Sequence, residues 1–290
     1  MGNEPNCDPV KSVENSLEAG FGGEGIFCWG GVGLNSYLWV MVLGIIGAGG
    51  VGQAFAKRLS AIGHTVYLVH RPHQVIEGAF AQLTQWEALS WESLDAVLLC
   101  VRDQQIAPLA REIQHTTKTH IPIAHTAGSV DIEALPGFAR RGVVYPLQTF
   151  SPGVAINWGE FPVFWEGDEL FFDLAVALTG TAERVHYADS LERLRLHIGA
   201  VFVANFTNAM ADIAQKVVSP RWDFRVYLPL LEAVVGKLHV LSPGEAQTGP
   251  ARRGDVETLQ KHLSYLEAHW PALAPLYEML SRYIQDQSLQ

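Results

Sequence analysis

The sequence has few cysteines and few charged residues. Cys7, Cys28 and Cys100 are its three cysteines, and no two of them have the CxxC spacing of a zinc site. So few cysteines cannot build a disulfide framework, and we expect a reducing, cytoplasmic environment. Charged residues make up 17% of the 290 residues, which is too few for a coiled coil. These shortages exclude a disulfide-rich secreted domain and a fibrous protein.

A surplus of positive charge is also absent. The chain has 20 Lys and Arg against 30 Asp and Glu, a net charge of −10, so we expect no nucleic-acid partner. The 11 histidines lack carboxylate or thiolate neighbours at ligand spacing, so we expect no metal site. We also expect no membrane association, because the uncharged stretch from residue 25 to residue 56 is rich in glycine.

The apolar fraction of 48% is large enough for two domains, each with its own hydrophobic core. Residues 41–167 alternate strand-like and helix-like segments, which predicts a dinucleotide-binding α/β domain. Residues 168–290 are mostly helical in pattern, which predicts a second, helical domain. We expect residues 1–40 to be a flexible extension, and one explanation for it is translation from a start codon upstream of the natural one.

A glycine-rich turn stands between the first expected strand, Val42–Ile46, and a helix over Gln53–Ile62. The turn has the GxGxxG pattern, and a second strand over Thr65–Val69 completes a βαβ unit. Backbone N–H groups of such a turn bind a pyrophosphate at the positive end of the helix. The expected cofactor-binding residues of the turn are Gly47, Ala48, Gly49, Gly50, Val51 and Gly52.

The end of the second strand selects between NAD and NADP. An NAD enzyme has Asp or Glu there for the ribose hydroxyls, whereas this chain has His70 and Arg71. A guanidinium can bind a 2′-phosphate through two hydrogen bonds, so the sequence favours NADP, with NAD as the less favoured cofactor. The alternative is that Arg71 is a solvated loop residue.

Further strands are expected at Leu94–Val101, His120–His125, Gly142–Tyr145 and Phe161–Trp165, with another at Arg184–Tyr187. Ligands of open α/β sheets bind beyond the carboxyl ends of the strands. The residues expected there to contact the cofactor are Cys100, Val101, Asp103, His125 and Thr126. Cys100 itself is expected to be a small buried side chain rather than a reactive thiol.

A long helix is expected from Ser190 to about Val218. His197, Asn205 and Asn208 are separated by helical spacings that place them within one narrow arc. These three are the candidate catalytic residues, facing the cofactor cleft. The alternative is that they are hydrogen-bonded core or interface groups.

Several of these segments recur in this order in one bacterial family. They include the glycine motif, His125-Thr126-Ala127-Gly128-Ser129, Tyr145-Pro146-Leu147-Gln148-Thr149-Phe150, Asn205-Phe206-Thr207-Asn208 and Gln247–Asp255. Over residues 41–285 the chain resembles Rossmann-like proteins that have a C-terminal helical domain of unknown function and are labelled NADP oxidoreductases. It is more distantly similar to pyrroline-5-carboxylate reductase and to 6-phosphogluconate dehydrogenase-like proteins. The resemblance implies a Rossmann domain followed by an all-α domain like the C-terminal domain of 6-phosphogluconate dehydrogenase, and a homodimer built through the helical domain.

One departure from those relatives limits the chemistry. Where hydroxyacid dehydrogenases have a catalytic lysine on the long helix, this chain has Asn205, and an amide cannot transfer a proton. Imine reduction depends less on that lysine, and His197 is suited to proton transfer. Arg252, Arg253 and Asp255 are candidate substrate-binding residues, with the arginines holding an anion and Asp255 also placed to cap a helix.

Two functions therefore remain open. The first is an NADP-dependent oxidoreductase acting on a small, anionic metabolite. The second is a non-catalytic dinucleotide-binding sensor or partner protein that has lost the reacting group. A third function, which we rank last, is that of a reductase that uses a deazaflavin together with NADP.

Overall fold

The computed structural model describes residues 40–151 and 153–287. Apart from Val40, the extension expected at residues 1–40 lies outside these described residues. The chain divides between Ala200 and Val201 into two compact units, each of which has its own architecture.

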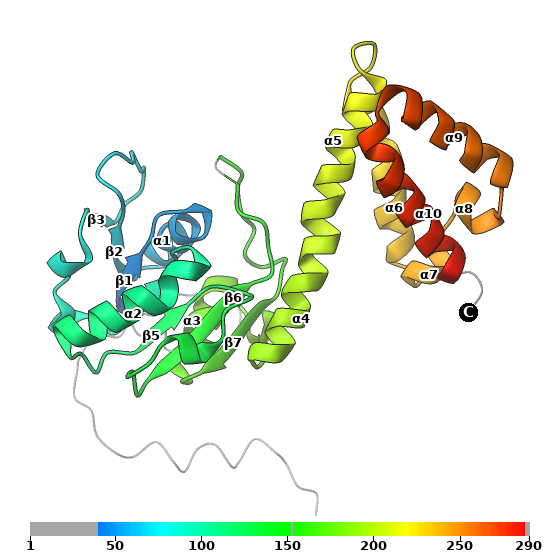
Figure 1. Ribbon diagram of the computed structural model, residues 1–290. Helices are drawn as coiled ribbons and strands as arrows, with labels where there is room; N and C mark the ends of the chain where they lie inside the picture. The colour runs from blue at the N-terminus through cyan, green and yellow to red at the C-terminus, as the bar shows by residue number, and fades with distance from the viewer. Residues whose placement is uncertain (1–39, 152, 288–290) are drawn as a thin grey trace, which may run out of the picture. The chain divides into compact units, whose positions relative to one another are not determined.

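Eight strands of the described residues in the first unit form one sheet, in the order β3-β2-β1-β4-β5-β6-β7-β8 (Figure 1). Their bounds are β1 Val42–Ile46, β2 Thr65–Val69, β3 Ala81–Leu83, β4 Ala96–Leu99, β5 Ile123–His125, β6 Arg141–Pro146, β7 Val163–Gly167 and β8 Val185–Tyr187. All neighbouring strands pair in parallel except β6 and β7, which are antiparallel. The order reverses between β1 and β4, which is where an open α/β sheet binds its ligand.

Helices cover both faces of this sheet. Helices α1 (Gly50–Ala61) and α3 (Leu170–Thr179) pack in one hydrophobic cluster with Leu43 and Ile45 of β1. Helix α2 (Asp103–Thr117) packs in a second cluster, which contains Ile46 of β1. Because side chains alternate across a strand, β1 contributes side chains to both clusters. It is apolar throughout, as expected for a strand that is buried on both faces.

The structure confirms the expected strands Val42–Ile46 and Thr65–Val69 residue for residue. The first unit extends beyond residue 167, where the sequence analysis divides the chain, because α3 packs against the sheet and β8 pairs with β7. Strand β3 was not expected, because its Ala-Gln-Leu segment is largely exposed and has no apolar run.

The long helix is interrupted by a wider turn. Helix α4 spans Ser190–Ala200, a π-helical segment spans Val201–Phe206, and α5 continues over Thr207–Val218. The uniform 3.6-residue geometry that places His197, Asn205 and Asn208 on one arc therefore does not hold, since a π-helical turn contains more residues. Such turns occur often at functional sites.

The second unit is helical over its described residues. Its helices after α5 are α6 Leu228–Leu238, α7 Pro243–Ala246, α8 Pro250–Arg253, α9 Val256–His269 and α10 Ala274–Gln287. The 3₁₀ turns of this unit are η7 Phe224–Tyr227 and η8 Pro271–Leu273, and those of the first unit are η2 Trp86–Ala88, η3 Trp91–Ser93, η4 Ile132–Ala134 and η5 Ala182–Arg184. No helix in the described ranges is long and apolar enough to cross a membrane.

Candidate active site

The glycine turn between β1 and α1 has no space for side chains at Gly47, Gly50 and Gly52, and a Cβ on Gly50 would lie 2.6 Å from the Phe150 carbonyl oxygen. Gly47 has a φ of +109°, and a Cβ added to it would lie 2.5 Å from the Cys100 carbonyl oxygen. A Cβ on Gly52 would lie 1.8 Å from the Gly47 carbonyl oxygen. Glycine is therefore required here so that β1, the turn and α1 can pack together.

Gly49 is different, because an added Cβ would meet no heavy atom within 4 Å. Its backbone is extended, with φ −72°, and it precedes the first residue of the 12-residue helix α1. The unpaired N–H groups of this helix end carry partial positive charge. An open glycine at such a position fits the pyrophosphate of a dinucleotide, which needs close approach to the backbone.

The loop after β2 is joined to the glycine turn by a side chain that the sequence analysis missed. The Gln74 amide donates to the Ala48 carbonyl (3.3 Å), and its oxygen accepts from the Arg71 backbone N–H (3.1 Å). His70 Nδ1 lies 2.8 Å from the Arg71 carbonyl oxygen, and the Arg71 side chain is exposed. Arg71 is therefore held by its backbone next to the turn, with its guanidinium free to reach a ligand.

The end of β4 contributes a thiol that is not reactive. Burial raises the pKa of Cys100 to about 12, and its thiol is hydrogen-bonded to the Thr126 side chain. The thiolate is therefore not populated near neutral pH, in agreement with the small buried side chain expected from the sequence. Beyond Val101, the Asp103 carboxylate at the start of α2 accepts a hydrogen bond from the Ser129 hydroxyl (2.5 Å).

His125 ends β5 and is completely buried. Its Nδ1 accepts from the Ala127 backbone N–H (3.2 Å), and its Nε2 lies 3.4 Å from the Asp131 carbonyl oxygen. Burial, followed by the charge of Arg193, lowers its pKa to about 4. His125 is therefore a neutral side chain that shapes the loop over residues 126–131.

The next strand brings a tyrosine to His197. The Tyr145 hydroxyl, near the end of β6, lies 3.1 Å from Nδ1 of His197 on α4. The two rings meet edge to face, with centroids 5.9 Å apart. Gly128 packs against both, since a Cβ there would lie 2.7 Å from His197 Nδ1 and 2.8 Å from Tyr145 Cζ. The sequence analysis noted Tyr145 within a motif and did not give it a role.

A buried ion pair fixes the start of α4. The Arg193 guanidinium is 1% exposed; it pairs with the Glu166 carboxylate and donates to the Val130 carbonyl (2.6 Å). The Ser190 hydroxyl donates to Glu166 (3.0 Å) and accepts from Arg193 (3.2 Å). Because His197 follows Arg193 by four residues, this pair also sets the position of His197.

The remaining candidate residues lie in the second unit, and their part in the site stays a prediction. Asn205, Asn208, Arg252 and Arg253 are exposed. Asp255 caps α9 by accepting from the Thr258 backbone N–H (3.1 Å), as expected, and Arg253 lies 3.9 Å from it. Within the described residues, no cluster of three or more His, Cys, Asp or Glu side chains is arranged to hold a metal ion.

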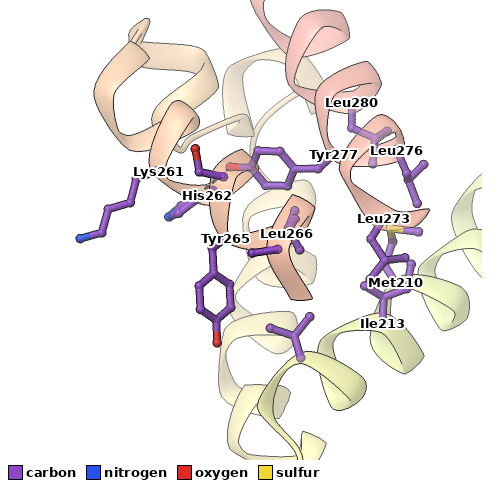
Figure 2. Close-up of a pocket in the computed structure, with 13 residues that line it drawn as sticks. Met210, Ile213, Lys261, His262, Tyr265, Leu266, Leu273, Leu276, Tyr277 and Leu280 are labelled. Carbon is purple, nitrogen blue, oxygen red and sulfur yellow. Dashed lines mark hydrogen bonds between the residues drawn. The ribbon is translucent and has the colours of Figure 1, made fainter. Parts of the chain in front are cut away.

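The second unit also has an apolar groove of about 660 Å³ (Figure 2). Its lining includes Met210 and Ile213 of α5, Leu266 of α9, and Leu276 and Leu280 of α10. On one side, His262 Nδ1 lies 2.7 Å from the Tyr277 hydroxyl. Of the apolar side chains described in this unit, Ala251, Leu259 and Ala274 alone are buried, so the unit has little core of its own.

The sheet order, the glycine turn and the polar groups at the carboxyl ends of β4, β5 and β6 define a Rossmann-type dinucleotide-binding protein. Two family models match the chain. One, described as NADP oxidoreductase coenzyme F420-dependent, matches residues 42–128. The other, described as domain of unknown function DUF2520, matches residues 161–284. No curated protein is significantly similar to this chain.

A solved structure of a putative NADP oxidoreductase from Bacteroides fragilis has 32% sequence identity and a TM-score of 0.76; the match covers 85% of this chain and 98% of that one. The chain therefore belongs to the family that joins an NADP oxidoreductase-type Rossmann domain to DUF2520.

Two more distant structures share the fold. A reductive aminase from Aspergillus terreus in complex with NADPH and ethyl levulinate has 18% identity and a TM-score of 0.60, covering 86% of this chain and 95% of that one. A pyrroline carboxylate reductase from Plasmodium falciparum with NADP bound has 12% identity and a TM-score of 0.51, covering 86% and 98%. At these identities the likeness concerns the fold alone.

Proposed function

We propose that this protein is an NADP-dependent oxidoreductase that acts on a small, anionic metabolite. The observation that carries the proposal is the glycine turn, with an open Gly49, at the same edge of the sheet as the Tyr145–His197 pair. The first can bind a dinucleotide, and the second can transfer a proton. The Bacteroides relative, described as a putative NADP oxidoreductase, supports this assignment.

The reaction that fits these groups best is reduction of a C=N or C=O bond. NADPH, when bound, supplies a hydride. The chain must then supply a proton to the nitrogen or oxygen, and an asparagine at position 205 cannot do this. The exposed guanidinium groups of Arg252 and Arg253 are the candidates for holding an anionic substrate.

Arg71 should determine the preference for NADPH. A guanidinium bound to the 2′-phosphate through charge-assisted hydrogen bonds is worth about 1.5–3 kcal/mol. The wild-type protein should therefore bind NADPH roughly 10- to 150-fold more tightly than NADH. The Arg71→Ala variant should lose most of this difference by weakening NADPH binding alone. Calorimetric titration of both nucleotides measures it.

Arg111→Ala is the matched control, since Arg111 is exposed on α2 and lies outside the proposed site. It should leave both affinities unchanged. Equal affinities of the wild-type protein for NADPH and NADH would contradict the assignment of Arg71. Tight NADPH binding without turnover of any imine, oxo acid or hydroxy acid would favour the sensor over the enzyme.

We infer that a second copy of the chain covers the apolar surface of the second unit. Large apolar side chains are exposed on the π-helical segment, α5 and α6. They include Phe202, Phe206, Leu230 and Val235, whose exposed fractions are 64%, 48%, 64% and 51%. A patch of this kind marks an interaction surface in a protein of otherwise ordinary composition. A homodimer would bury it, and sedimentation equilibrium should then give about twice the chain mass of 31.9 kDa.

A further inference from the structure

The contact between β6 and α4 joins two titratable side chains at the ligand-binding edge of the sheet. The Tyr145 residue is 8% exposed, whereas His197 is half-buried and retains contact with solvent. Their only polar connection given by the described residues is the one between the Tyr145 hydroxyl and His197 Nδ1, at 3.1 Å. A buried hydroxyl is thereby connected to solvent through an imidazole.

Gly128 packs on this pair from the edge of the sheet where the ligand is expected. It lies in the loop after β5, beyond the carboxyl end of a parallel strand, and its backbone packs directly on both rings. Any larger residue would displace the pair, because the added Cβ would be closer than 3 Å to each ring. The loop that follows β5 therefore holds Tyr145 and His197 together at the edge where the cofactor is expected.

The fully buried guanidinium of Arg193 on α4 is the charged group that acts on Tyr145. Burial raises the pKa of Tyr145, while the positive charge of Arg193 partly opposes this effect. Glu166 neutralises Arg193 through the buried ion pair. The tyrosine therefore keeps its proton near neutral pH and can act as an acid.

We propose that Tyr145 is the proton donor of the reduction and that His197 returns the proton to it from solvent. The inference rests on the proposed function. As a hydride reaches the carbon of the C=N or C=O bond, the π electron pair moves to the heteroatom and takes the Tyr145 hydroxyl proton. The tyrosinate oxygen then takes the Nδ1 proton of the His197 imidazolium, and the imidazole is reprotonated from solvent. One hydride and one proton are consumed in each turnover, so the step balances.

The first test is kinetic, with NADPH and two probes, 1-pyrroline-2-carboxylate and 2-oxobutyrate. Tyr145→Phe keeps the ring and should lower kcat at least roughly 100-fold, the usual contribution of a general acid, with NADPH affinity unchanged. Tyr187→Phe is the control, because Tyr187 lies on β8 and is 60% exposed. Wild-type turnover with an equally active Tyr145→Phe variant would overturn the inference and leave the proposed function intact. Absence of turnover by the wild type with both probes would contradict both.

The second test needs no substrate. In protein labelled with 13C at tyrosine Cζ, the Tyr145 resonance is identified by its loss in Tyr145→Phe. It should titrate with the same midpoint as the His197 ring and should stop doing so in His197→Ala, whereas the Tyr187 resonance should not respond. A Tyr145 resonance that is insensitive to His197→Ala would show that the two side chains do not exchange a proton, and would overturn the inference.

Discussion

Replacing Arg193 by alanine should lower the free energy of unfolding by about 3–5 kcal/mol, because it leaves the Glu166 carboxylate buried without its partner. The Ser190 hydroxyl and the Val130 carbonyl would lose hydrogen bonds at the same time. Denaturant unfolding measures the change. Glu166→Gln keeps the shape of the partner and removes only its charge, so it should also destabilise the protein while allowing it to fold.

Arg140→Ala is the control for that prediction. Arg140 also forms an ion pair, at 2.8 Å from Asp168, but its side chain is 52% exposed. Solvent screening limits such a pair to about 1 kcal/mol or less. Equal losses of stability in Arg193→Ala and Arg140→Ala would show that the buried pair has no special role.

The stability of the protein should fall steeply between pH 6.5 and pH 4 because of His125. Its pKa is about 4 in the folded protein against 6.5 in an unfolded chain, so the unfolded chain binds a proton over this range that the folded protein does not. The contribution of His125 to stability is complete above pH 6.5 and is lost as the pH falls towards 4. The shift corresponds to about 3 kcal/mol.

His125→Asn isolates this effect, because asparagine does not titrate and its carbonyl oxygen can accept the Ala127 N–H bond. Burial also lowers the pKa of His64, so part of the acid sensitivity should remain in this variant. The difference in unfolding free energy between pH 7.5 and pH 4 should be about 3 kcal/mol smaller than in the wild type. An identical pH dependence in the two proteins would contradict a buried, neutral His125.

The strand, turn and helix around the glycine motif could be predicted from sequence because their steric requirements are local. The strand, glycine turn and helix from Val42 to Ala61 each limit the residue types that fit, and the structure has these elements in place. The cap at Asp255 was predictable for the same reason, since a capping side chain bonds within its own helix turn.

The rest of the site depends on contacts between distant segments. Tyr145 and His197 are 52 residues apart, and neither has a sequence neighbour that indicates the pair. Charged helical residues are usually solvated, so nothing in the sequence singles out Arg193, and only the fold shows that Glu166 is buried beside it. The π-helical segment from Val201 to Phe206 could not be anticipated, because its apolar spacing resembles that of an α-helix.

The most direct test of the central assignment compares NADPH binding by the wild-type protein and by Gly49→Ala. A methyl group at this position meets no protein atom and its backbone is unstrained, so the melting temperature should not change. If the pyrophosphate lies against this backbone, the methyl group obstructs it, and calorimetric titration should show NADPH affinity at least roughly 10-fold weaker than in the wild type. Equal NADPH affinities in the two proteins, or no NADPH binding by the wild type, would contradict the account.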